Sequence, residues 1–178
     1  MKTTSRIALG GIMGALSLLC LLLTVFPYAT YALPALASFF LFPVIIEGGK
    51  KLGAAVYVAT ALLALLIVPD IEAKALYVSF FGAYPLLKSV AERVSRVGEW
   101  VIKLAAFNAA AVLTYGVLLG LQLVPIADFA VGSLATPVAL GVLLAAGNAV
   151  FVLYDIGLTR VLSVYVYRFQ PLLRRYLK

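Results

Sequence analysis

Residues 7–26 read IALGGIMGALSLLCLLLTVF, a run of 20 residues without a charged side chain. A helix of about 20 apolar residues spans the hydrocarbon core of a bilayer. Lys2 and Arg6 precede the run, but it is longer than the apolar part of a typical signal peptide. We therefore interpret it as a retained first transmembrane helix of an integral membrane protein.

The composition of the whole chain agrees with this interpretation. Of its 178 residues, 65% are hydrophobic and only 12% are charged. Soluble domains are usually about 45–50% apolar and about 25% charged. A soluble domain of this size could not bury so much apolar surface, because small domains have a high ratio of surface to volume. We expect one transmembrane domain over residues 1–178, with no additional soluble module.

The apolar runs predict an all-α protein, because a lipid-embedded backbone must satisfy its own hydrogen bonds and the runs do not alternate as strands do. About six transmembrane helices are expected, at roughly 7–26, 31–46, 52–68, 75–90, 101–124 and 134–162. The second and fourth runs are short for a span. This predicts that they are tilted, bent or partly interfacial.

The basic residues predict the orientation of the six helices. With six spans, 13 of the 14 Lys and Arg residues fall on one side of the membrane and only Lys74 on the other. The 13 are Lys2, Arg6, Lys50, Lys51, Lys88, Arg93, Arg96, Lys103, Arg160, Arg168, Arg174, Arg175 and Lys178. Positively charged loops remain in the cytoplasm. We therefore expect a plasma-membrane protein with both termini in the cytoplasm, and its net charge of +7 indicates anionic lipid rather than nucleic acid.

The C-terminal stretch 163–178 is basic and mixes apolar residues with Arg at helical spacing. One interpretation is an amphipathic helix on the cytoplasmic surface of the membrane. The other is the end of the sixth helix, whose long cationic side chains reach toward the interface.

Small residues form a stripe along the first helix. They are Gly10, Gly11, Gly14 and Ala15. Pairs of small residues four apart let two membrane helices approach closely. The stripe therefore predicts tight packing, either on another helix of this chain or on a separate subunit.

Aromatic and charged residues gather on the side predicted to face outward. Those considered as substrate-binding residues are Tyr28, Tyr31, Asp70, Glu72 and Tyr77. One interpretation is an interfacial belt of aromatic residues. The other is the mouth of a small-molecule site, in which apolar walls and a few polar groups fix a ligand.

Polar residues also occur within the predicted fifth and sixth helices. Asn108 and Asn148 lie at depths that would let them meet, and both are further candidates for substrate binding. Asp155 shares a helix face with Asn148, and an intramembrane carboxylate is normally partnered. We expect Lys103 or Arg160 to pair with Asp155 and to form a structural polar lock between the two helices.

Several classes of function are disfavoured by what the sequence lacks. It has no His and one Cys, Cys20, which excludes a disulfide framework and disfavours metal sites. No base stands ready for a nucleophile, and no glycine-rich phosphate loop follows a strand. We expect no enzymatic activity, no cofactor and no bound metal.

The runs RIALGGIMGAL at 6–16 and YALPAL at 31–36 resemble the start of the substrate-binding (S) subunits of energy-coupling factor transporters. This resemblance implies a membrane-embedded subunit that captures a small organic nutrient, such as a vitamin, for a multi-subunit importer. It implies a transmembrane coupling subunit with two ATPases as the partner. The contact with this partner would be made by Gly10, Gly11, Gly14 and Ala15. The resemblance also implies an outward site framed by loops like those holding Tyr28, Tyr31, Asp70 and Glu72.

Two alternatives remain open at this stage. One is a structural or assembly protein of the cell envelope without a ligand. The other is a small transporter that acts alone, which is less favoured because the two halves of the chain do not repeat a pair of broken helices.

Overall fold

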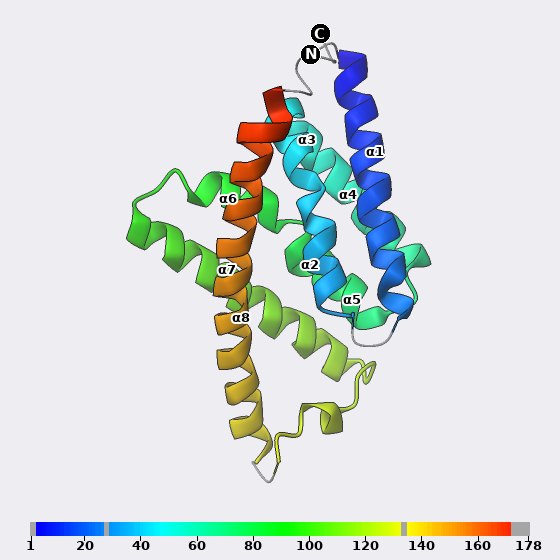
Figure 1. The fold of residues 1–178 in the computed structure, drawn as a ribbon. Coiled ribbons are helices and arrows are strands. Elements are labelled where there is room, and N and C mark those ends of the chain that lie inside the picture. Colours follow the sequence, from blue (N-terminus) through cyan, green and yellow to red (C-terminus); the bar gives the residue numbers. More distant parts are fainter. Residues whose placement is uncertain (1–2, 27–28, 133–134, 172–178) are drawn as a thin grey trace.

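The computed structural model describes residues 3–26, 29–132 and 135–171. Over these ranges the chain is helical, with no strand, and its helices form consecutive segments (Figure 1). The segments are α1 (Thr3–Leu22) with η1 (Leu23–Val25), α2 (Ala32–Phe39) with α3 (Leu41–Gly48), α4 (Lys50–Ile67), α5 (Ile71–Leu76) with η2 (Tyr77–Phe81) and α6 (Tyr84–Ala91), α7 (Arg96–Gly120), and α8 (Thr136–Val164) with η4 (Tyr165–Phe169). The short η3 (Ile126–Phe129) lies between α7 and α8.

The prediction of an all-α fold is confirmed. Among the described residues, 4 helices are long and apolar enough to cross a membrane, at Thr3–Val25, Lys50–Ile67, Arg96–Gly120 and Thr136–Phe169. The second segment, Ala32–Gly48, is apolar but shorter, and the fourth is divided. The expected count of six spans and their orientation therefore stay predictions.

The second and fourth segments are both interrupted, at places that their prolines help to explain. Pro43 lacks the N–H that would bond to the Phe39 carbonyl, and α2 ends there before α3 begins. Pro85 lies in the first turn of α6, where a missing N–H costs nothing. Between α5 and α6 the chain forms η2, which is a π-helical turn.

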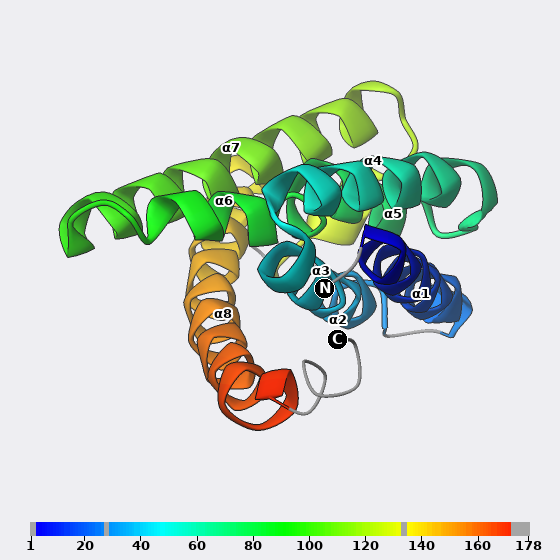
Figure 2. The same cartoon turned by 90° about the horizontal axis from the view of Figure 1, so that it is seen from above.

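Helices α1 to α4 pack together around an apolar core. Its buried residues include Leu21 of α1, Leu41 of α3 and Ala64 of α4, each fully inaccessible to solvent. Seen along the axis of α1, α3 lies inside, between α1, α4 and α6, whereas α8 stands at the edge (Figure 2).

A second core of aromatic side chains connects α3, η2, α6, α7 and α8. Phe80 of η2 lies at its centre, with ring centroids of Phe107 and Phe151 at 5.3 and 5.5 Å. The Phe107 and Phe151 rings stack at 4.8 Å and join α7 to α8. Such ring pairs add to the apolar burial that holds the two long helices together.

The start of α1 and the end of η4 lie at the same end of the molecule (Figure 1). Residues 165–169 continue α8 as a π-helical turn and helix extends to residue 171, so this part of the stretch 163–178 prolongs α8. Residues 172–178 lie outside the described part of the chain.

Gly53 provides a test of the close packing between α3 and α4. A Cβ at this position would overlap Ile45 Cγ1. We expect Gly53→Ala to lower the free energy of unfolding by about 1–3 kcal/mol, because an overfilled core must move side chains or backbone. The measurement is denaturant unfolding of the purified protein in detergent micelles.

Gly141→Ala is the matched control, since no atom lies within 4 Å of a Cβ placed there. Its effect should be within about 1 kcal/mol. Equal losses for the two variants would contradict the packing.

Candidate functional site

Two groups of polar side chains join parts of the chain that are distant in sequence. We call the first the loop cluster; it consists of Thr30, Tyr31, Asp70, Glu72 and Tyr115. We call the second the buried charge network; it consists of Tyr84, Lys88, Lys103 and Asp155. Both groups contain carboxylates, so among the described residues they are the candidates considered first for binding a polar group.

Glu72 is the centre of the loop cluster. Its Oε1 accepts hydrogen bonds from the Tyr31 hydroxyl at 2.8 Å and from the Tyr115 hydroxyl at 2.6 Å. Beside it, Asp70 Oδ2 accepts from the Thr30 hydroxyl at 2.8 Å. Asp70 Oδ1 also accepts from the Ala73 N–H, and so caps the first turn of α5. The cluster therefore ties the chain before α2 to the start of α5 and to α7.

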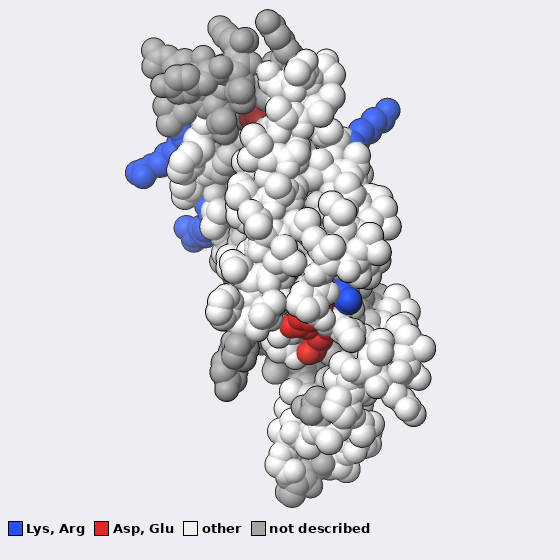
Figure 3. Space-filling view, turned by 90° about the vertical axis from the view of Figure 1, so that its right-hand side faces the viewer, with Lys and Arg blue, Asp and Glu red and all other residues white. Residues whose placement is uncertain are grey.

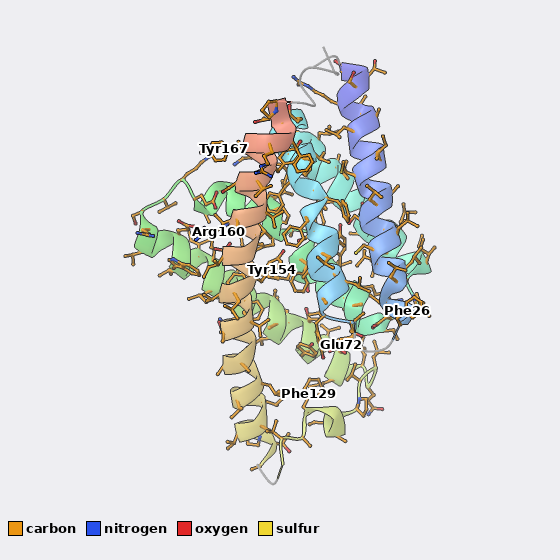
Figure 4. All side chains as sticks on the ribbon, viewed as in Figure 1. Phe26, Glu72, Phe129, Tyr154, Arg160 and Tyr167 are labelled. Atoms are coloured by element: carbon orange, nitrogen blue, oxygen red, sulfur yellow. The ribbon has the colours of Figure 1, made fainter. Side chains whose placement is uncertain are left out.

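The loop cluster carries negative charge that no cation of the described chain neutralises by an ion pair. The nearby Lys74 Nζ donates to the Val68 carbonyl at 3.2 Å, and no ion pair joins it to Asp70 or Glu72. Acidic side chains reach the surface in the half of the molecule away from the start of α1, with a basic side chain beside them (Figure 3), in the region where Glu72 is labelled in Figure 4. Phe129 packs edge-on against Tyr115, with centroids 5.4 Å apart.

In the buried charge network, one carboxylate accepts hydrogen bonds from side chains of two neighbouring helices. Asp155 Oδ1 accepts from Lys88 Nζ at 2.7 Å and from the Tyr84 hydroxyl, and Oδ2 accepts from Lys103 Nζ at 2.9 Å. The lysine side chains are 1% exposed and that of Asp155 is 4% exposed. Each lysine also forms an ion pair with a more exposed carboxylate four residues away in sequence. The partner is Glu92 for Lys88 and Glu99 for Lys103.

Such a network must be complete to be tolerated. Removing charges from water is costly, and mutual attraction repays this only when every partner is present. Lys88 Nζ makes a further bond to the Thr159 hydroxyl at 2.9 Å, so its donors are used within the network. We infer that the network is primarily a lock that sets α6, α7 and α8 in one arrangement.

Sequence reasoning paired Asp155 with Lys103 or Arg160, and the structure pairs it with Lys103. Arg160 is exposed to the surroundings, which agrees with its position further along α8. The reasoning missed Lys88 and Tyr84. The sequence signal that could have indicated them is their spacing of four residues, which places both side chains on one face of a helix.

Asn108 and Asn148 face each other across α7 and α8. Each side-chain amide donates to the other's carbonyl oxygen, at 2.8 and 2.9 Å, and also to the backbone carbonyl four residues earlier. Both N–H groups of each amide are thus used within the chain. The pair joins two helices rather than presenting free groups to a ligand.

The remaining substrate-binding candidates do not converge on one place. Tyr77 is fully buried, where its hydroxyl lies 3.0 Å from Ser17 Oγ. Tyr31 is 57% exposed and belongs to the loop cluster. Tyr28 lies outside the described residues. Tyr115 completes the cluster and was not among the substrate-binding candidates named from the sequence.

The small-residue stripe of α1 is divided between two faces. Gly10 and Gly14 face α4, where an added Cβ would lie 3.0 and 3.2 Å from methyl groups of Val56. Gly11 and Ala15 are exposed, and nothing lies within 4 Å of a Cβ placed at Gly11. The first pair therefore packs within the chain, and only the second pair is open to a partner.

A cavity of about 70 Å³ lies between α3 and the end of α8. Its lining is Phe39, Phe42, Pro43, Leu158, Val161, Leu162 and Tyr165. Sites for small organic ligands usually measure about 300–1,000 Å³, so this apolar space is too small for one. Among the described residues, no three His, Cys, Asp or Glu side chains are grouped to hold a metal ion.

Comparison with known proteins does not assign the chain to a family. No protein family, curated protein sequence or solved structure matches the chain.

The buried charge network predicts a large difference between two carboxylates. Asp155→Asn leaves two buried lysines without their shared partner, and we expect it to destabilise the fold by about 3–5 kcal/mol. Glu92→Gln, at a side chain 41% exposed, should cost less than about 1 kcal/mol. Denaturant unfolding in the same detergent measures both. An Asp155→Asn variant as stable as Glu92→Gln would show that the network is not a lock.

Proposed function

We propose that the chain is a membrane-embedded capture subunit of a multi-subunit importer for a small organic nutrient such as a vitamin. It crosses the plasma membrane six times, with both termini in the cytoplasm. The distribution of basic residues supports this orientation, with 13 of 14 on one side. The start of α1 and the end of η4 lie at one end of the molecule, which agrees with an even number of spans.

The loop cluster is the observation that carries the proposal. It lies in the half of the molecule away from the start of α1, with η3 and the start of α8 beyond it (Figure 4). In this orientation that half faces the extracellular side. Within the described chain, its Glu72 carboxylate is held by the neutral hydroxyls of Tyr31 and Tyr115, and Phe129 adds a third aromatic ring nearby. A carboxylate among aromatic rings attracts an organic cation by charge and by cation–π contact. The nutrient class that fits this chemistry bears a positive charge.

Capture requires the loop cluster to open, because its side chains bond to one another and the cavity of about 70 Å³ lies elsewhere, between α3 and α8. The half-exposed Tyr31 stands before α2 and is joined to the rest of the cluster by its hydroxyl. A ligand cation would replace the two tyrosine hydroxyls at Glu72, so that Tyr31 and Tyr115 are released from the carboxylate as the ligand enters.

The open face of α1 supports a separate coupling subunit as partner. Gly11 and Ala15 leave a shallow surface on which a second helix can approach closely. The capture subunit has no phosphate-binding loop, so the energy for transport comes from ATPases bound to that partner.

A structural or assembly role in the cell envelope is the second candidate. The observation that favours it is the closed packing of the polar groups, since the buried charge network and the Asn108–Asn148 pair are satisfied within the chain. This role needs the same open face of α1 but no ligand.

The partner contact can be tested with two small residues of α1. Gly11→Leu should abolish co-purification of a coupling subunit and its ATPases in mild detergent, because the added side chain blocks the open face. The fold should remain intact, since the space around a Cβ at this position is empty. Ala15→Ser, which keeps a small residue, is the control and should retain the partner. Recovery of the coupling subunit with Gly11→Leu would contradict this interface.

Ligand capture can be tested without knowing the ligand. Native mass spectrometry of protein purified from its own membranes should detect a bound organic cation, released on denaturation. Glu72→Gln should lose it, because the carboxylate charge is removed while the side-chain shape is kept. Glu99→Gln, far along α7 from the loop cluster, should retain it. Protein that carries only lipid in both forms would favour the assembly role.

A further inference from the structure

The divided fourth segment, Ile71–Ala91, is anchored in both polar groups. Its first part, α5, carries Glu72 of the loop cluster. Its last part, α6, carries Tyr84 and Lys88 of the buried charge network. The π-helical turn η2 lies between them. This turn therefore sets how the two anchors are oriented relative to each other.

A π-helical turn contains more residues than an α-helical turn. Here the Gly82 N–H bonds to the carbonyl of Tyr77, five residues earlier, at 2.8 Å. Adding or removing one residue from a helix rotates the rest of that helix by about 100° and shifts it by about 1.5 Å. If η2 became α-helical, α5 and α6 would change their relative rotation by that amount. The segment could not then keep both anchors in place.

Contacts with neighbouring helices hold η2 in its π-helical form. The Tyr57 hydroxyl of α4 donates to the Val78 carbonyl at 2.6 Å. The Tyr57 ring occupies the place of a missing side chain at Gly82, where a Cβ would lie 2.6 Å from Tyr57 Cε2. From α7, the Thr114 hydroxyl donates to Ser79 Oγ at 2.7 Å.

These contacts make η2 a candidate for an element with two states. π-helical turns are rare and occur often at functional sites. They are less favourable than α-helix, so this one depends on its contacts with α4 and α7. A local element with two discrete packings can transmit a change between sites.

We propose that η2 is a conformational switch that couples the loop cluster to the buried charge network. In the π-helical state both polar groups are complete. In the α-helical state α5 is rotated, so that Glu72 leaves Tyr31 and Tyr115, and Tyr84 of α6 also leaves Asp155. The coupling is a property of the chain alone and needs no ligand, so its test is independent of the proposed capture function.

The test measures one distance across the switch by electron paramagnetic resonance in lipid nanodiscs. Spin labels are attached at Ile71→Cys and Val97→Cys, both exposed, after Cys20→Ala removes the native thiol. Tyr115 bonds to Glu72, the neighbour of Ile71, and lies about 27 Å from Val97 along α7. The two labels are therefore separated by a distance that the method can measure. The native background should give one narrow distribution.

Two conservative variants then disturb the switch from either side. Tyr57→Phe removes the hydroxyl that holds the Val78 carbonyl, and Tyr84→Phe removes one donor to Asp155. Each should produce a second population displaced by about 4 Å, the movement of a helix backbone rotated by one residue. Tyr167→Phe, at a residue 82% exposed, is the control and should leave one population.

The result from Tyr84→Phe is the decisive one, because its hydroxyl lies in the buried network and the labels do not report on that network directly. A single native-like population with either Tyr57→Phe or Tyr84→Phe would overturn the proposal. Both substitutions retain the aromatic ring, so the core remains filled and the protein can be measured in its folded form.

Discussion

The arrangement of the second half of the chain depends on the carboxylate of Asp155. In lipid the hydrophobic effect does not drive helices together, since the surroundings are as apolar as the helices themselves. The relative orientation of the helices must therefore be set by buried polar and charged side chains, which are costly to leave without a partner. Asp155 with Lys88 and Lys103 fixes both the rotation and the depth of α6, α7 and α8. The aromatic rings around Phe80 then fill the space that this contact defines.

The first half of the chain is held by a different means. Helices α1, α3 and α4 approach closely because Gly10, Gly14 and Gly53 carry no side chain where a neighbour fits. Tyr77 connects the two halves, since it lies in the core of the first while its own turn, η2, contributes to the second. A rigid packed half and a polar locked half thus share one irregular segment. That segment is where movement would be least costly.

Most of the helices could be predicted from the sequence, because a long apolar run in lipid must satisfy its own backbone hydrogen bonds, and a helix does so. The sequence also indicated that the second and fourth runs would be irregular, although not that the fourth contains a π-helical turn. That turn depends on Tyr57 and Thr114, which belong to other helices and give no local signal. The pairing of Asp155 with Lys103 could be predicted from the sequence, because their helices follow one another along the chain. Finding Lys88 and the Glu72–Tyr115 contact required the fold.

The order of synthesis gives the buried charge network a further consequence. The ribosome makes Lys88 and Lys103 well before Asp155, so during insertion the two lysines have no shared carboxylate. Both lie near the predicted cytoplasmic ends of their helices, where a long side chain can keep its ammonium group among lipid headgroups. The arrival of α8 lets them leave the headgroups and enter the protein. A chain that ends before α8 would therefore keep two lysines without the carboxylate that they share in the full fold.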